Sequence, residues 1–312
     1  MKKHLSSLLL LLTAAIWGFA FSAQKAAEAL PPFTIGMLRS AVAAIFLVFV
    51  ILFFDKIRHT GRFFFKKRTV FDLTRTEVIG GAICGTVLAT ATFFQQLGIN
   101  AGTDAGKTSF ITALYVVIVP IYALFLKKRA KLHIWISVVI AIIGFYFLCI
   151  TESFTVVPSD MIVFACSLIF PIHILAIDKF SPLCDGVRMS FVQFVTATVV
   201  NAALMLIFEP IPSGSAIVEN AIPILFLGVG SSGIAYTLQI IAQREADPTA
   251  ASIIMSLESV FGVIGSALLL GERMTDREYI GCAVVFIAVL ISEVSPKELY
   301  DKFKKKRNTG AD

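Results

Sequence analysis

Charged residues are scarce in this 312-residue chain, and their scarcity excludes a water-soluble globule. Asp, Glu, Lys and Arg make up 15% of the residues, hydrophobic residues make up 57%, and the mean hydropathy is +0.85. Soluble domains carry about 25% charged residues, so this chain lacks the polar side chains needed to cover an aqueous surface. Disorder is excluded too, because it requires low hydrophobicity and high net charge. The composition predicts a polytopic membrane protein.

Paired cysteines, metal-ligand pairs and a nucleotide-binding motif are also missing. The five cysteines are scattered without a Cys-x-x-Cys, so no disulfide framework is predicted. The four histidines are far apart in the sequence, and no metal or cofactor is expected. Residues 228–233 fit the pattern Gly-x-Gly-x-x-Gly, but no strand precedes them, so close helix packing is the better interpretation. No set of residues suits nucleophilic catalysis, and the sequence predicts a protein that is not an enzyme.

The net charge of +6 does not indicate a nucleic-acid partner. The basic residues lie in short blocks between apolar runs, as they do in the cytoplasmic loops of membrane proteins. Lys2, Lys3 and the leucine-rich run up to Ala23 are similar to a secretory signal peptide. Because many apolar runs follow, we interpret this segment as an uncleaved first transmembrane helix.

Long hydrophobic runs predict an all-α membrane protein with ten transmembrane helices. About 20 apolar residues are needed to cross a hydrocarbon layer of about 30 Å. The runs are continuous and do not alternate with polar residues, which favours helices over membrane strands. The predicted helices cover residues 5–24, 33–54, 77–98, 106–126, 132–150, 159–177, 187–207, 220–241, 249–270 and 278–294.

The distribution of Lys and Arg predicts the orientation of these helices. If the N-terminus is inside, 22 of the 27 basic residues fall in cytoplasmic segments and four fall in outer loops. This bias predicts ten spans with both termini cytoplasmic. The basic second loop contains Phe63, Phe64 and Phe65, which is typical of a segment at the anionic inner membrane surface.

An internal repeat relates the two halves of the chain. Residues 96–126 align with residues 239–269 without a gap, and each segment covers the third and fourth predicted helices of a five-helix half. The aligned pairs are Gln96 and Gln239, Asp104 and Asp247, Ser109 and Ser252, Leu114 and Leu257, Val117 and Val260, Ile121 and Ile264, and Leu126 and Leu269. Because five is an odd number, the second half must enter the membrane in the opposite direction.

The predicted organisation is therefore two inverted five-helix repeats, residues 1–150 and residues 151–296, followed by a basic cytoplasmic tail, residues 297–312. Inverted repeats build many transporters, with the substrate site near the bilayer midplane between the repeats. Two such halves can exchange conformations, so that a central cavity opens to each side of the membrane in turn.

Short motifs in both halves resemble those of the drug/metabolite transporter superfamily, in particular its EamA-type ten-helix members. The matching segments are Trp17-Gly18, Leu30-Pro31-Pro32, Leu38-Arg39, Asp247-Pro248-Thr249-Ala250-Ala251, Leu257-Glu258 and Leu270-Gly271-Glu272-Arg273. The chain departs from the family in two places. Ser259 stands where the family often has proline, and Lys127-Lys128-Arg129 stands where the repeat would place a second Gly-Glu-Arg motif.

The resemblance implies a secondary transporter for a small metabolite, an amino acid or a drug-like solute. The expected location is the plasma membrane, which in a bacterium is the inner membrane, and such proteins are frequently exporters. Without a nucleotide motif, transport would run downhill or on an ion gradient, with proton coupling as one hypothesis. The expected partners are the solute and the lipid bilayer, and a monomer is the working hypothesis. The alternative is a membrane binding or sensor protein without translocation, or a membrane enzyme.

Ionisable residues within the predicted helices must have a function or a structural partner, because a charge at the bilayer centre costs at least about 2.5–3.5 kcal/mol. Glu258 either faces a cavity, where it binds a cation or a proton, or makes a hydrogen bond between helices. Arg39 either binds an anionic group of the substrate or locks helices together. His173 lies two residues after Pro171, which is expected to kink or locally open this helix. His173 either titrates near neutral pH or packs in the interior.

Uncharged polar residues form stripes on four further predicted helices. Such stripes avoid lipid and face either neighbouring helices or a wet cavity. We expect a cavity rich in Trp, Tyr, Gln and Thr, which suits a solute with polar and apolar parts. With the resemblance, the stripes predict that helices 1, 3, 4, 6, 8 and 9 line the cavity. The candidate cavity residues are Trp17, Gln24, Gln95, Gln96, Thr112, Tyr115, His173, Tyr236, Gln239 and Glu258.

Overall fold

A computed structural model describes most of the chain, and every described element is a helix. The described residues are 3–60, 72–127, 131–149, 158–269, 271 and 276–293. The phenylalanine-rich part of the basic second loop and the predicted basic tail, residues 297–312, lie outside the described residues, as does most of the Gly-Glu-Arg motif.

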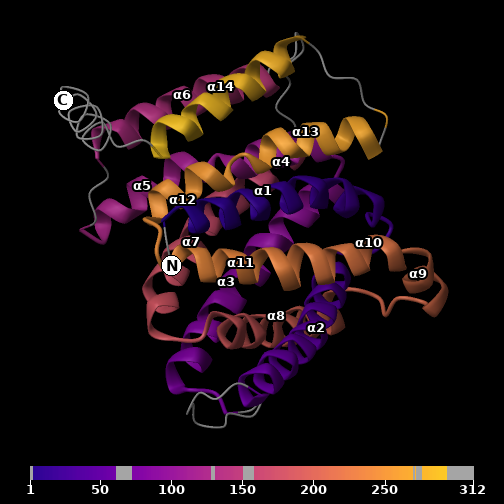
Figure 1. Ribbon diagram of the computed structural model, residues 1–312. Helices are drawn as coiled ribbons and strands as arrows, with labels where there is room; N and C mark the ends of the chain where they lie inside the picture. Colours follow the sequence, from indigo (N-terminus) through magenta and orange to yellow (C-terminus); the bar gives the residue numbers. More distant parts are fainter. Residues whose placement is uncertain are drawn as a thin grey trace.

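The helices follow the predicted apolar runs to within a few residues (Figure 1). The helices before residue 150 are α1 (Lys3–Ala26), α2 (Pro32–Thr60), α3 (Arg75–Asn100), α4 (Ala105–Ala113), α5 (Tyr115–Phe125) and α6 (Leu132–Cys149). The later helices are α7 (Pro158–Phe180), η1 (Ser181–Leu183), α8 (Gly186–Phe208), α9 (Gly214–Glu219), α10 (Ala221–Leu225), the π-helix η2 (Phe226–Tyr236), α11 (Thr237–Gln243), α12 (Pro248–Met255), α13 (Glu258–Leu269) and α14 (Asp276–Glu293).

Eight helical stretches of the described chain are long and apolar enough to cross a membrane. They coincide with eight of the ten predicted spans: His4–Ala26, Pro32–Lys56, Arg75–Asn100, Ala105–Phe125, Pro158–Leu183, Gly186–Phe208, Ala221–Gln243 and Pro248–Leu269. The other two predicted spans, α6 and α14, carry shorter apolar stretches at Leu132–Gly144 and Tyr279–Ile291. The chain is therefore a multi-pass membrane protein.

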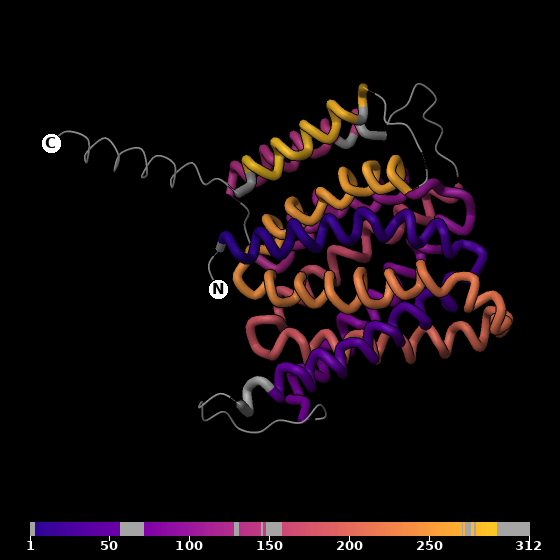
Figure 2. Tube along the Cα trace, turned by 45° about the vertical axis from the view of Figure 1, so that its right-hand side comes forward, coloured from indigo at the N-terminus to yellow at the C-terminus, as the bar shows by residue number. Residues whose placement is uncertain are grey.

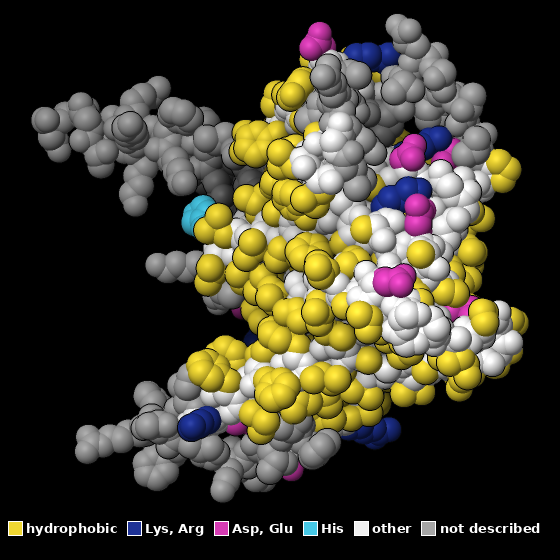
Figure 3. All heavy atoms as spheres, turned by 90° about the vertical axis from the view of Figure 1, so that its right-hand side faces the viewer, with side chains coloured by type: hydrophobic (Ala, Val, Ile, Leu, Met, Phe, Trp, Pro, Cys, Tyr) yellow, Lys and Arg dark blue, Asp and Glu magenta, His cyan; other side chains and the backbone are white. Residues whose placement is uncertain are grey.

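The outer surface is apolar, as a lipid-facing exterior must be. Hydrophobic side chains cover the middle of the face in Figure 3, and most of the charged side chains lie toward its right-hand and lower edges. Phe125, Leu132, Ile211 and Ile222 are among the most exposed large hydrophobic residues. An apolar surface of this extent would aggregate in water, whereas hydrocarbon solvates it.

Local sequence signals explain where some helices begin. Thr74 caps α3, because its hydroxyl accepts a hydrogen bond from the Glu77 amide while the Glu77 carboxylate accepts one from the Thr74 amide. Asp247 caps α12 through the amides of Thr249 and Ala250, and Pro248 fills the first helical position.

The stretches Ala105–Phe125 and Pro248–Leu269, which are the fourth and ninth predicted spans, are both interrupted, and the interruptions coincide in the internal repeat. Leu114 separates α4 from α5, and Ser256 and Leu257 separate α12 from α13. Leu114 aligns with Leu257, so the first residues after the two breaks, Tyr115 and Glu258, are equivalent positions. The repeat seen in the sequence therefore has a counterpart in the local backbone.

Equivalent helices of the two halves also pack on one another. Helix α2 packs against α8, and α6 packs against α14 at one edge of the bundle (Figures 1 and 2). The centre is built from α1 against α13 and from α3 against α7. Helix α1 begins and α14 ends at the same end of the bundle in both views.

Gly18 lets α1 touch α13 through the backbone, and this contact yields a stability prediction. A Cβ atom at Gly18 would lie 2.3 Å from Phe261 Cβ and 2.6 Å from the Phe261 carbonyl carbon. Since overpacking costs about 1–3 kcal/mol, Gly18→Ala should lower the melting temperature in detergent. Gly214→Ala is the matched control, because nothing lies within 4 Å of a Cβ there. Equal melting temperatures for the two variants would contradict this packing.

Candidate functional site

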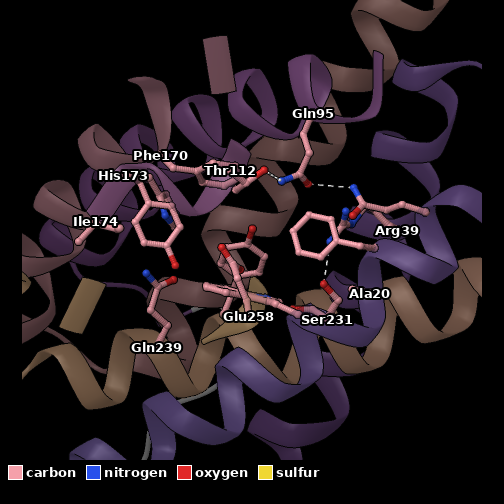
Figure 4. Close-up of a pocket in the computed structure, with 15 residues that line it drawn as sticks. Ala20, Arg39, Gln95, Thr112, Phe170, His173, Ile174, Ser231, Gln239 and Glu258 are labelled. Carbon is pink, nitrogen blue, oxygen red and sulfur yellow. Dashed lines mark hydrogen bonds between the residues drawn. The ribbon is translucent and has the colours of Figure 1, made fainter. Parts of the chain in front are cut away.

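A cavity lies at the centre of the bundle, between helices of both halves (Figure 4). Its volume is about 30 Å³. That volume holds about two or three water molecules, so the cavity is narrow in this conformation. Its lining residues are Trp17, Ala20, Phe21, Gln24, Arg39, Gln95, Thr112, Tyr115, Phe170, His173, Ile174, Ser231, Tyr236, Gln239 and Glu258.

Nine of the ten candidate residues derived from the sequence lie in this lining, together with Arg39. Gln96 does not line the cavity. Its amide nitrogen donates instead to the Gln24 carbonyl oxygen at 3.3 Å and to Asn100 Oδ1 at 2.8 Å, which ties α3 to α1. The difference arises because successive residues of a helix point about 100° apart, so Gln95 and Gln96 face different neighbours.

A chain of side-chain amides and hydroxyls forms one wall of the cavity. Gln24 Nε2 donates to Gln95 Oε1 at 2.9 Å, and Gln95 Nε2 donates to Thr112 Oγ1 at 3.0 Å. Thr112 Oγ1 lies 3.5 Å from the Cys166 sulfur. These contacts connect α1, α3, α4 and α7 and fix the orientation of both amides, so this wall is a preorganised polar surface.

Aromatic rings form a second wall. The ring centroids of Trp17 and Tyr236 are 4.5 Å apart, and those of His173 and Tyr236 are 5.7 Å apart in an edge-to-face arrangement. Trp17 Nε1 donates to the Ser231 carbonyl oxygen at 3.3 Å. His173 Nε2 is hydrogen-bonded to Gln193 Oε1 of α8 at 3.0 Å, and this contact fixes the orientation of the imidazole ring. A solute with an apolar body can pack against Trp17 and Tyr236.

Arg39 is a buried cation without a carboxylate partner among the described residues. Its side chain is 6% exposed, Nε donates to Ser232 Oγ at 3.1 Å, and one terminal nitrogen donates to Ser231 Oγ at 2.9 Å. Both hydroxyls belong to η2, so Arg39 joins α2 to this π-helix. Two neutral hydroxyls orient the guanidinium, and no described residue supplies a counter-ion for its charge.

Glu258 is a buried carboxylate in the first turn of α13, and it lies beside Tyr115. Among the described residues, Glu258 Oε1, the Tyr115 hydroxyl and Gln239 Oε1 have no hydrogen-bond partner of acceptable geometry. All three residues line the cavity. An unsatisfied buried polar atom costs about 1–3 kcal/mol, so these atoms indicate a place where a ligand or ordered water makes hydrogen bonds.

The small residues next to Glu258 serve helix packing. The sequence places Gly262 and Gly265 on the Glu258 face, as a groove for a neighbouring helix or a ligand. A Cβ atom at Gly262 would lie 2.6 Å from Ser109 Oγ of α4, and one at Gly265 would lie 3.3 Å from the Phe19 ring of α1. Neighbouring helices therefore fill the groove, and Glu258 is left as the cavity-facing group of this stretch.

Five lining residues are absent from the sequence-derived candidates: Ala20, Phe21, Phe170, Ile174 and Ser231. Four of them are apolar residues in apolar helices, which carry no compositional signal. Phe21 follows Trp17 by four residues, and that spacing on one helix face could have identified it. Ser231 lies in the glycine-rich segment 228–233, which also packs closely, because a Cβ atom at Gly228 would lie 2.5 Å from Val42.

A multi-pass helical protein with a polar cavity between its halves has the architecture of a membrane transporter. The EamA-like transporter family model matches residues 4–150 and again residues 158–293. The chain therefore belongs to the EamA-like transporter family, within the drug/metabolite transporter superfamily. This membership points to a transport role and not to catalysis.

Individual relatives agree with this assignment. An uncharacterized transporter of Archaeoglobus fulgidus is 27% identical over 295 residues, which cover 93% of this chain and 86% of the relative. The uncharacterized transporter YoaV of Bacillus subtilis is 21% identical over 285 residues, which cover 89% and 92%. One solved crystal structure shares the fold with a TM-score of 0.71 at 17% identity, over 92% of this chain and 96% of that chain.

Proposed function

We propose that this transporter moves a small solute through the central cavity by alternating access and that it works as an exporter in the plasma membrane. The observation that carries the proposal is the cavity itself, a narrow space lined from both halves by polar oxygens that have no hydrogen-bond partner among the described residues. A site of this kind would bind one solute, and it would release it when either side opens.

The proposed architecture is ten spans in two inverted repeats, residues 1–150 and 151–296, with both termini cytoplasmic. Here α6 and α14 complete the set of spans as a peripheral pair. The coincident breaks at Leu114 and Leu257 support the repeat. Discontinuous helices at corresponding positions of two repeats are typical of a transporter's binding site, and the residues after these breaks, Tyr115 and Glu258, both line the cavity.

The antiparallel helices α2 and α8 are joined at each end by hydrogen bonds to a carboxylate, and we call each of these contacts a closure. Near the end of α2, Asp55 accepts hydrogen bonds of 3.0 and 2.9 Å from Arg188 at the start of α8. Just after α8, Glu209 accepts hydrogen bonds from the Phe33 amide at 2.7 Å and the Thr34 amide at 2.8 Å, at the start of α2. Each closure joins one half to the other. We propose that they open in turn, one on each side of the membrane.

A third contact between the halves lies at the edge of α4 and α7. Lys107 Nζ forms an ion pair with Asp160, whose carboxylate also accepts a hydrogen bond from Thr103. In the proposed orientation this pair lies on the outer side, together with the Glu209 closure. Outward opening would therefore break both contacts while the pair of Asp55 and Arg188 stays intact.

Glu258 is the proposed site of ion coupling. It lies at the break between α12 and α13, where the repeats meet the cavity. A carboxylate in this position can carry a proton in one direction and exchange it for the solute in the other. Proton-driven export through Glu258 therefore needs neither a nucleotide nor a metal.

Solute flux in sealed vesicles tests the proposed function. Solutes that raise the melting temperature of the purified protein would first be selected from amino acids, nucleosides, sugars and cationic drugs. At least one of them is then expected to cross reconstituted vesicles at a rate at least tenfold above that of protein-free vesicles. A solute that binds and yet shows no flux would contradict the proposal and favour a membrane sensor.

A further inference from the structure

An apolar groove runs along α1 and is separate from the central cavity. Its volume is about 610 Å³. Trp17 lines the cavity and Phe19 lines the groove, and two residues of a helix that are two positions apart point about 200° apart. Helix α1 lies between α13 and the segment from α10 to α11 in Figure 1, and it packs against both. The body of α1 therefore stands between the groove and the cavity.

Small side chains form the floor of the groove, and large apolar side chains form its walls. The floor includes Ala15, Ala23 and Ala26 of α1. One wall includes Ile222 of α10 and the other includes Leu269 at the end of α13. Ile222 is 83% exposed and Leu269 is 62% exposed, so the groove opens to the exterior of the bundle. In a membrane this exterior is hydrocarbon.

The length of the groove corresponds to one leaflet of the bilayer. A rise of about 1.5 Å per residue places Ala15 about 16 Å from Ala26, where α1 ends. The hydrocarbon layer is about 30 Å thick, so the groove extends from the membrane interface to a point near the midplane. An acyl chain of one lipid has this reach, whereas a membrane helix of a second copy would extend beyond the groove into the other leaflet.

Polar groups lie at the interfacial end of the groove. Lys25, next to Ala26, pairs with Glu28 at 2.8 Å, and both side chains are partly exposed. An ammonium group has three donors, so Lys25 can bind a phosphate while it keeps this pair. Ser22 is the polar residue of the lining, and its hydroxyl has no hydrogen-bond partner among the described residues. The order of Lys25, Ser22 and apolar floor along α1 matches the order of phosphate, ester group and acyl chain in a phospholipid.

We propose that this groove is a binding site for one glycerophospholipid of the leaflet in which α1 ends, with an acyl chain along the floor from Ala23 to Ala15 and the phosphate at Lys25. The floor belongs to the first half of the chain and both walls belong to the second half. The bound lipid packs against both halves, so it stabilises their arrangement in this conformation. The site does not depend on which solute, if any, crosses through the central cavity.

Native mass spectrometry of the full-length protein tests the site. The protein is transferred into mild detergent from nanodiscs of palmitoyl-oleoyl phosphatidylglycerol. At least half of the wild-type chains should retain one phospholipid. Chains that retain no lipid would overturn the proposal. A lipid-free dimer would overturn it too, because the groove would then be the contact surface for a second copy.

Substitutions that fill the groove locate the bound lipid. Ala26→Phe places a ring at the interfacial end and should lower the lipid-bound fraction at least fivefold. Ala203→Phe is the matched control, because Ala203 is an exposed alanine of α8 outside the groove, and it should retain lipid as the wild type does. If Ala26→Phe does not fold, Ala15→Phe fills the other end. Equal lipid-bound fractions for the groove variant and the control would contradict the site.

Charge variants test the position of the phosphate. Lys25→Gln removes the cation and should lower the lipid-bound fraction at least threefold. Glu28→Gln leaves Lys25 in place without its carboxylate partner, and its lipid-bound fraction should be at least that of the wild type. A loss in Glu28→Gln together with full retention in Lys25→Gln would contradict the proposed orientation of the lipid.

Thermal unfolding tests whether the lipid stabilises the two halves. A ligand that binds only the folded state raises the melting temperature by mass action. Phosphatidylglycerol added to delipidated protein should therefore raise the melting temperature of the wild type and of Ala203→Phe, and it should raise that of Ala26→Phe much less. An equal rise in all three would mean that the lipid acts outside the groove, which would contradict the proposal.

Discussion

The Glu258→Gln variant is expected to lose at least nine-tenths of the solute flux measured in sealed vesicles. Glutamine keeps the size of the side chain and removes its charge, so the side chain at position 258 could no longer exchange a proton. The packing around the cavity should be retained, because glutamine and glutamate have nearly the same volume. The measurement is the initial rate of uptake across an imposed pH gradient, at several external pH values.

The same experiment distinguishes an ion-coupling role of Glu258 from a purely structural role. A coupling carboxylate makes the wild-type rate depend on the pH gradient, and the dependence should disappear in the Glu258→Gln variant. Glu28→Gln should keep both rate and dependence, since Glu28 pairs with Lys25 at the surface. An unchanged rate and pH profile for Glu258→Gln would mean that Glu258 is a packing residue.

The Asp55→Ala variant is expected to lose about 3–5 kcal/mol of stability, the cost of removing one partner of a buried ion pair. Arg188 is 2% exposed, and Asp55 accepts two of its hydrogen bonds. Alanine would leave the buried guanidinium without this carboxylate. Thermal unfolding in detergent measures the effect.

Two controls define this prediction. The double variant Asp55→Leu with Arg188→Met removes both charges, and it should recover most of the loss. Glu28→Ala removes a surface pair and should cost at most about 1 kcal/mol. A melting temperature that is the same for Asp55→Ala and Glu28→Ala would show that the closure between α2 and α8 contributes little.

The membrane helices are predictable from the sequence because length and apolarity are enough to specify them. The breaks in the fourth and ninth predicted spans are not predictable, since Leu114 and Leu257 are ordinary apolar residues with no local signal for an interruption. The π-helix η2 gives no signal either, although its glycines allow the close approach to α2. These features depend on packing between distant segments, which composition and periodicity do not report.

The candidate site is likewise predictable from the sequence only in part. Polar residues on apolar helices are conspicuous, and nine of the ten selected from the sequence line one cavity. Gln96 is adjacent to Gln95 and equally polar, and only the packing of α1 on α3 separates their environments. The pairing of Arg39 with Ser231 and Ser232 spans about 190 residues of sequence and has no local signature.

Accessibility of the cavity from the two sides of the membrane is the most direct measurement. Ala20→Cys places a thiol in the lining of a variant whose five native cysteines are replaced by serine. A membrane-impermeant thiol reagent is expected to label it when added to either side of oriented vesicles, and a transported solute should slow both reactions. Labelling from one side only, with and without solute, would contradict alternating access through this cavity.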